Sequence, residues 1–314
     1  GVIAHFAVLG FFVISGIAIT MSLVLNLVRN KSRLDFREYT IARISRIHPP
    51  LIFSILLCIV FYVTMRVFNL LGIYQSFKLD GDLYVVREWF HFSIKDILTT
   101  IIFESSSLVK INGPLWSLII EWWIYFLALV FVGVFYVKST FKKVLLALIF
   151  ILIFIKLMKL DGIIYLILWF MGAVYYLFGK KYNTLFNVLL VLSLISLFFV
   201  NYYMHFFEKM TDLSTLPIVQ ILFGLCFLGL ILKLPAKTFF NSMAKYSYTI
   251  YIIHFPFFIF IFSIFHKSTQ GLLGINILLS FLSIIIILFL AAKSAVVFEN
   301  KKYYAGLLNR WVDK

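Results

Sequence analysis

Long runs of apolar residues, separated by short polar segments, dominate the hydrophobic pattern of this 314-residue chain. The runs are continuous rather than alternating, which is typical of membrane-spanning helices and not of strands in a transmembrane barrel. A helix needs about 20 apolar residues to cross a bilayer. The pattern therefore predicts nine spans, at residues 6–28, 49–72, 115–137, 142–157, 162–179, 186–204, 216–233, 247–266 and 273–297.

The composition supports this interpretation. Hydrophobic residues make up 63% of the chain and charged residues only 13%, whereas soluble domains average about 45–50% and about 25%. We expect an all-α, polytopic transmembrane helical bundle that forms a single domain over residues 1–314. Cys58 and Cys226 fall within apolar runs and are interpreted as core residues. The six histidines have no paired spacing, so no metal site is expected.

The basic residues are concentrated in every second loop. If the nine spans alternate in direction, one side carries 18 Lys and Arg residues against four acids, and the other side nine against eight. The positive-inside rule makes the basic side, with the C-terminus, cytoplasmic. This distribution explains the pI near 9.7 better than nucleic-acid binding does, and it favours contact with membrane lipid headgroups. Gly1 then lies outside, and we expect one more helix upstream of it.

The one long loop, residues 73–114, lies on the outer side in this topology. Ser93 and Asp96 have the spacing of a capping box and predict a helix start. The apolar stretch that follows is too short to span, so it is interpreted as interfacial or re-entrant.

Glu121 is a lone carboxylate within the apolar run 115–137. An ionisable group at the centre of a span costs at least about 2.5–3.5 kcal/mol by insertion scales, so it normally faces a cavity or a partner. Two interpretations remain open: a functional carboxylate, or a structural acid paired with a neighbouring basic or hydroxyl group.

Arg43 and Arg46 precede the second span in the string Arg-Ile-Ser-Arg-Ile-His-Pro-Pro. Arginines three residues apart lie on one helical face, and their guanidinium groups suit phosphate oxygens. The alternative is ordinary anchoring at a cytoplasmic helix end. Pro49 is expected to start the following helix.

Three further polar positions have possible chemical roles. Ser15 and Gly16 lie in the first span and fit either a site or close helix packing. His254 lies about 10 Å into the membrane from the inner end of its span and needs a partner or a water-filled cavity there. Glu299 ends the last span and is expected to pair with a nearby Lys or Arg.

At these positions the chain resembles the membrane acyltransferase-3 family, the bacterial integral-membrane O-acyltransferases of surface polysaccharides. Several motifs recur in the family's order along essentially the whole chain. They are Phe11 to Gly16 (FFxxSG), Arg43 to Pro49 (RxxRIxP), Trp116 to Glu121 (WSLxxE), Phe170 to Ala173 (FxxG), Ser247 to Pro256 (SYxxYxxHxP) and the terminal acid Glu299.

Two positions depart from the family pattern. The family's first helix carries a histidine thought to be catalytic, and His5 stands too close to Phe11 to be that residue. We expect the histidine on the upstream helix. In addition, Asn300 and Lys301 replace the proline that often follows the last acid.

The resemblance implies acetyl transfer from cytoplasmic acetyl-CoA to a hydroxyl of a surface polysaccharide such as O-antigen, or of a lipid-linked sugar, in the bacterial inner membrane. Arg43 and Arg46 would bind the coenzyme A phosphates. Glu121 and His254 are the catalytic candidates, beside the upstream histidine. The candidate substrate-binding residues are Ser15, Trp116, Ser117, Trp122 and Tyr251, although aromatic packing is an alternative for the tryptophans.

Two other functions also fit buried polar residues in a bundle. A transporter or flippase of lipid-linked glycans would have a through-membrane path, but no internal repeat is visible in the sequence. A polysaccharide polymerase would need no acetyl-CoA. The ordered motifs favour the acyltransferase.

Overall fold

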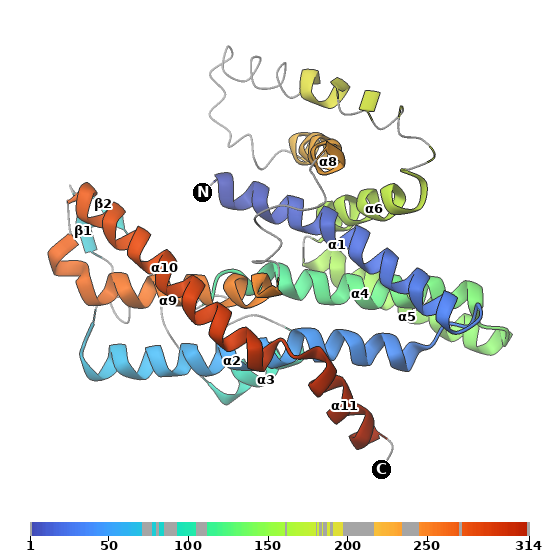
Figure 1. Cartoon of the computed structure of the whole chain (residues 1–314), viewed down its shortest axis with the longest axis horizontal. Helices are drawn as coiled ribbons and strands as arrows, with labels where there is room; N and C mark the ends of the chain where they lie inside the picture. Colours follow the sequence, from blue (N-terminus) through green and yellow to red (C-terminus); the bar gives the residue numbers. More distant parts are fainter. Residues whose placement is uncertain are drawn as a thin grey trace. The chain divides into compact units, whose positions relative to one another are not determined.

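In the computed structural model, the residues that the structure describes form helices, the turns at their ends and one short hairpin (Figure 1). Strands β1 (Phe77–Leu79) and β2 (Asp82–Tyr84) pair antiparallel in that hairpin. The predicted helical class is confirmed. The structure describes residues 2–70, 77–79, 82–84, 93–104, 112–160, 162–179, 181, 184, 187–188, 191–196, 217–233, 245–269 and 272–312.

Five helices in the described part are long and apolar enough to cross a membrane, so the predicted count of nine is not confirmed. These are His5–Arg29, Phe36–Val67, Leu115–Tyr136, Ser247–Phe265 and Leu273–Trp311. Two shorter apolar helices, Ile163–Phe178 and Pro217–Gly229, match further predicted spans. Helix α5 (Thr140–Lys159) has 20 residues but carries lysines at both ends. Most of the predicted span 186–204 lies outside the described residues.

The chain groups into two compact units, which are described separately. Unit 1 comprises Gly1–Tyr39 and Ile120–Thr238, and unit 2 comprises Thr40–Ile119 and Phe239–Lys314. The single-domain organisation stays a prediction.

In unit 1, helix α1 (Val2–Arg29) packs against α6 (Ile163–Phe178) and α8 (Pro217–Lys233), and α6 also packs against α8 (Figure 1). The α1–α6 contact is close because it is built on glycine. A Cβ atom added to Gly16 would collide with the carbonyl of Trp169, and one added to Gly172 with the carbonyl of Val13. Small residues let transmembrane helices approach in this way.

A polar network fixes the turn between α1 and the next helix. The carboxylate of Glu38 accepts hydrogen bonds from the side-chain amides of Asn26 (3.0 Å) and Asn30 (2.9 Å) and pairs with Arg29 at 2.6 Å. Asn26 also accepts from the backbone N–H of Asp35. Buried amides need such partners, and together these bonds set the direction in which the chain leaves the turn.

Helix α2 (Phe36–Val67) runs through both Pro49 and Pro50 without a break. The prediction that Pro49 starts a helix is therefore wrong. Arg43 and Arg46 lie inside a continuous helix rather than before one. Prolines are tolerated in membrane helices because neighbouring groups satisfy the freed carbonyls.

Helix α3 (Ile94–Ile101) begins with the predicted capping box, in which the side chains of Ser93 and Asp96 each accept from the other's backbone N–H. Beyond its end, the ring of Phe103 meets the ring of His48 edge-on, with centroids 5.5 Å apart. His48 is 19 residues before the end of α2, or roughly 28 Å at the helical rise. The segment thus turns back alongside α2, which fits the re-entrant alternative.

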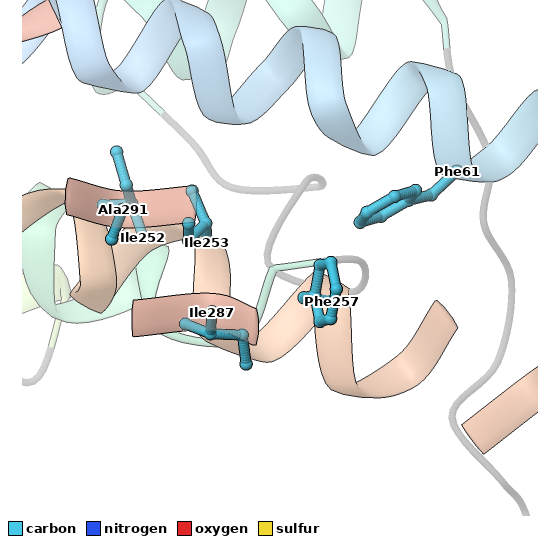
Figure 2. Packing of buried hydrophobic residues seen from close by; sticks show 6 residues of the cluster. All are labelled: Phe61, Ile252, Ile253, Phe257, Ile287 and Ala291. Atoms are coloured by element: carbon cyan, nitrogen blue, oxygen red, sulfur yellow. The ribbon is translucent and has the colours of Figure 1, made fainter. Parts of the chain in front are cut away.

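Unit 2 is built around α9 (Ser247–Thr269) and α10 (Leu273–Phe298), which pack against each other and precede α11 (Lys301–Val312). Phe61 of α2 stacks on Phe260 at 4.3 Å. Figure 2 shows side chains of α2, α9 and α10 in the buried cluster. Its members are Phe61, Ile252, Ile253, Phe257, Ile287 and Ala291.

Candidate functional site

Glu121 lies in helix α4 (Leu115–Tyr136) and is only 3% exposed. The hydroxyl of Ser15 donates to Glu121 Oε1 at 3.0 Å, and the hydroxyl of Tyr125 donates to the same oxygen. Ser15 and Glu121 were predicted separately as site residues, and the fold brings them together from positions 106 residues apart. Tyr125 was missed, although it stands one turn from Glu121 on the same helix face.

The approach of α1 to α6 explains why Ser15 reaches Glu121. Gly16 takes the packing role, since α6 leaves no space for its Cβ atom. Its neighbour Ser15 points its hydroxyl to α4 instead. Gly16 ends the FFxxSG motif, and Gly172 lies within the FxxG-like segment 170–173. These two motifs therefore form one helix contact.

Ser117 and Tyr251, both predicted to bind substrate, also meet. Their hydroxyls are in hydrogen-bond contact with each other. Both hydroxyl oxygens also lie within hydrogen-bond distance of the carbonyl oxygen of Pro114, that of Ser117 at 3.1 Å and that of Tyr251 at 3.0 Å. Each hydroxyl has one proton, so one of them donates to Pro114 and the other donates to its neighbouring hydroxyl. The WSLxxE and SYxxYxxHxP motifs thus join at the start of α4, where both hydroxyls hold the Pro114 turn.

His254 lines a cavity of about 390 Å³ in unit 2. Its Nδ1 lies 3.2 Å from the carbonyl oxygen of Ile250. A carbonyl only accepts, so this hydrogen bond requires the proton on Nδ1 and leaves the lone pair of a neutral ring on Nε2. The other lining residues are Ser247, Ile250, Tyr251, Phe258, Ile284, Ile287 and Leu288.

Arg43 is buried, with 7% exposure, and Arg46 is half-buried on the same face of α2. The ammonium group of Lys301 lies within electrostatic reach of both arginines and of Glu299. Guanidinium and ammonium groups are the donors that phosphate oxygens prefer, so these three basic groups are the candidates for holding a phosphate anion. Lys301 was not assigned to this group from the sequence. It was noted only because Asn300 and Lys301 stand where the family often has a proline. The hydroxyl of Tyr248 ties the same stretch of α2 to α9 through the carbonyl of Ile47 at 3.3 Å.

Glu299 has a second role at the start of α9. Its Oε1 accepts from the backbone N–H of Thr249 at 3.0 Å and from the hydroxyl of the same residue at 2.6 Å. A carboxylate there satisfies a backbone donor that the first helical turn leaves open and complements the helix dipole. The expected electrostatic partner of Glu299 is Lys301.

The tryptophans of α4 take part in packing. Trp122 is 8% exposed and meets Phe126 edge-on at 4.8 Å. Trp116 is half-buried. Lys156 of α5 lies over the ring of Trp123, 5.9 Å from its centroid. Trp122 is thus buried in an aromatic contact, as the packing alternative expected.

The predicted site residues are divided between the two units. Unit 1 holds Glu121, Ser15 and Trp122, and unit 2 holds the remaining candidates: Arg43, Arg46, Trp116, Ser117, Tyr251 and His254. Within the described ranges, no group of three or more His, Cys, Asp or Glu residues could hold a metal ion. Cys58 and Cys226 are both free and buried.

Five helices among the described residues are long and apolar enough to cross a bilayer, which defines a multi-pass membrane protein. The profile of the acyltransferase-3 family, described as an acyltransferase domain, matches residues 1–293. The chain therefore belongs to the acyltransferase-3 family, as its motifs predicted, and the family supports acyl transfer in a membrane. No curated protein and no solved structure matches the chain.

Proposed function

We propose that this protein is a membrane O-acetyltransferase that moves an acetyl group from cytoplasmic acetyl-CoA to a hydroxyl of a surface polysaccharide or lipid-linked sugar. The observation that carries the proposal is the buried carboxylate of Glu121 with two hydroxyl donors, Ser15 and Tyr125. A carboxylate that accepts hydrogen bonds from protein hydroxyl groups can also accept one from a hydroxyl of the sugar that receives the acetyl group. In this proposal the acceptor hydroxyl binds at Glu121.

The donor would be held in unit 2 by Arg43 and Arg46. Guanidinium groups bind phosphate oxygens through paired, charge-assisted hydrogen bonds. The burial of Arg43 strengthens such an interaction because little water competes for the guanidinium group. Lys301 adds a third positive charge close to both arginines. The protein would sit in the bacterial inner membrane with this basic group toward the cytoplasm.

The reaction exchanges one ester for another. The acceptor oxygen attacks the thioester carbonyl carbon, the C–S bond breaks, and the products are an O-acetyl ester and coenzyme A. The hydroxyl proton passes to a general base and then to the leaving thiolate. Glu121 orients and polarises the hydroxyl through its hydrogen bond. Among the described residues, His254 Nε2 is the candidate for this base.

The test uses full-length protein in membranes, with radiolabelled acetyl-CoA and the host's surface glycan. We expect label in the glycan, at least a 100-fold lower turnover for Glu121→Gln, and an apparent affinity for acetyl-CoA roughly 10- to 100-fold lower for Arg43→Ala. Arg66→Ala is the matched control, because Arg66 lies exposed at the other end of α2 and is bonded to Tyr62.

Two results would contradict the proposal. One is full turnover in a folded Glu121→Gln variant. The other is the absence of transfer together with no thermal stabilisation by millimolar coenzyme A, since a ligand that binds the folded state must stabilise it. The second result would favour a transporter of lipid-linked glycans.

A further inference from the structure

Unit 1 contains a cavity of about 580 Å³ between α1, α4, α5 and α6. Its wall is almost wholly apolar, and Thr20 is one of its few polar members. The lining residues of α4 are Ile124, Leu127, Ala128, Phe131, Val132 and Tyr136. From α1 come Thr20, Leu23, Val24 and Leu27, and from α6 Trp169, Phe170 and Ala173 among others.

The cavity continues the surface that carries Glu121. Its lining residues on α4 recur every three to four positions, which places them on one face of the helix. Glu121 precedes Ile124 by three residues on that face, so the carboxylate stands one turn before the cavity. On α1, Ser15 lies five residues before the first lining residue, Thr20, on a different face of the helix, and donates to Glu121. A polar cluster thus stands at one end of an apolar chamber.

The chemistry of the wall restricts what can fill the chamber. The cavity has the volume of a pocket for a whole small molecule, about 300–1,000 Å³. An acetyl group alone would leave most of it empty. A sugar would lose hydrogen bonds to water that apolar side chains cannot replace. A hydrocarbon chain needs no such bonds and gains from contact with Leu, Phe and Val side chains.

We propose that this cavity binds the hydrocarbon tail of a lipid-linked acceptor while Glu121 faces a hydroxyl of its sugar. This inference rests on the proposed function and names its acceptor class: a membrane lipid that carries the glycan, rather than a free polysaccharide. The expected topology agrees, because the start of α4 is its outer end. A lipid of the outer leaflet would have its sugar at Glu121 and its tail along Ile124, Ala128 and Phe131.

The first experiment measures binding without any acyl donor. Purified full-length protein in detergent is titrated with a radiolabelled long-chain polyprenyl phosphate, with phosphatidylglycerol as competitor. Ala128→Trp fills the chamber, and Ala147→Trp places the same ring on the exposed face of α5, outside the cavity. We expect at least tenfold weaker binding for Ala128→Trp and no change for Ala147→Trp. If Ala128→Trp does not fold, Val132→Trp at the half-exposed rim is used instead.

The second experiment measures transfer to one glycan carrying no tail, a short tail or a long tail. We expect kcat/KM to rise at least tenfold from the tail-free to the long-tailed acceptor, and this rise to disappear when the chamber is filled. Equal kcat/KM for all three acceptors would overturn the inference and leave the O-acetyltransferase proposal standing. Equal displacement of the probe by phosphatidylglycerol would also overturn it, as would unchanged binding in the filled variant. Specific binding without transfer to any acceptor would contradict the O-acetyltransferase instead.

Discussion

The side-chain amide of Asn112 donates a 2.7 Å hydrogen bond to the carbonyl oxygen of Ile252, across 140 residues of sequence. Ile252 is four residues before Pro256, which has no N–H and cannot give this carbonyl its helical partner. Ser54 donates to the same oxygen at 2.9 Å, and Asn112 also donates to Ser54. The segment before α4 thereby repairs the defect that the proline makes in α9.

This relationship predicts that Asn112→Ala destabilises the protein by about 1–2 kcal/mol, because a buried carbonyl loses a donor. Pro256→Ala restores the helical N–H to Ile252, so it should reduce the cost of Asn112→Ala. A double-mutant cycle on thermal unfolding in detergent measures the coupling. Strictly additive effects would show that Asn112 stabilises the protein by another route.

The glycine contact between α1 and α6 makes a second prediction. Gly16→Ala and Gly172→Ala each place a methyl group against a backbone carbonyl of the other helix, so both should lower thermal stability by about 1–3 kcal/mol. Gly274→Ala and Gly306→Ala are the controls, since nothing lies within 4 Å of the added carbon. Gly306→Ala in α11 should even stabilise, by up to about 1 kcal/mol. Similar losses at all four positions would disprove the packing argument.

The hydroxyl donors of Glu121 can be tested one at a time. Ser15→Ala and Tyr125→Phe each remove one hydrogen bond to the carboxylate, and we expect at least about tenfold lower turnover with a folded protein. Ser283→Ala is the control, because Ser283 is equally buried but donates only within its own helix, to Leu279. Turnover in both variants equal to that of the control would make the two hydroxyls dispensable.

The basic group in unit 2 leads to a fourth prediction. Lys301→Ala should lower the apparent affinity for acetyl-CoA several-fold, and the loss should shrink at high salt because screening weakens exposed charges. Lys302→Ala, a change of the same kind at the next exposed position, should have little effect. Equal effects of the two substitutions would assign Lys301 to general surface charge.

The cap on α9 separates the two roles of Glu299. Glu299→Ala removes the acceptor for Thr249 and should cost about 1–2 kcal/mol of stability, as the loss of a helix cap does. Glu299→Gln keeps an oxygen acceptor and should cost less. Thermal unfolding of both variants is the measurement. If the Gln variant is as unstable as the Ala variant, then the charge near Lys301 matters more than the cap.

Much of the site was predictable in kind but not in arrangement. The isolation of Glu121 in an apolar run, the paired arginines and the motif order are all local features of the sequence. Tyr125 had a local signal, its spacing from Glu121, whereas Lys301 had none. Pro49 misled the prediction of α2, because the rule for helix starts assumes that no neighbour compensates for a proline within the helix.

The sequence by itself determined the helical membrane class, the long apolar spans, the family and the residues that are expensive to bury. These follow from hydropathy and from spacing within a few turns, which any segment carries with it. Only the tertiary structure decided that Ser15 donates to Glu121, that Asn112 donates to the carbonyl of Ile252, and that an apolar cavity begins one turn after the carboxylate. Such pairings join residues from separate helices, and they form only when packing brings those helices together.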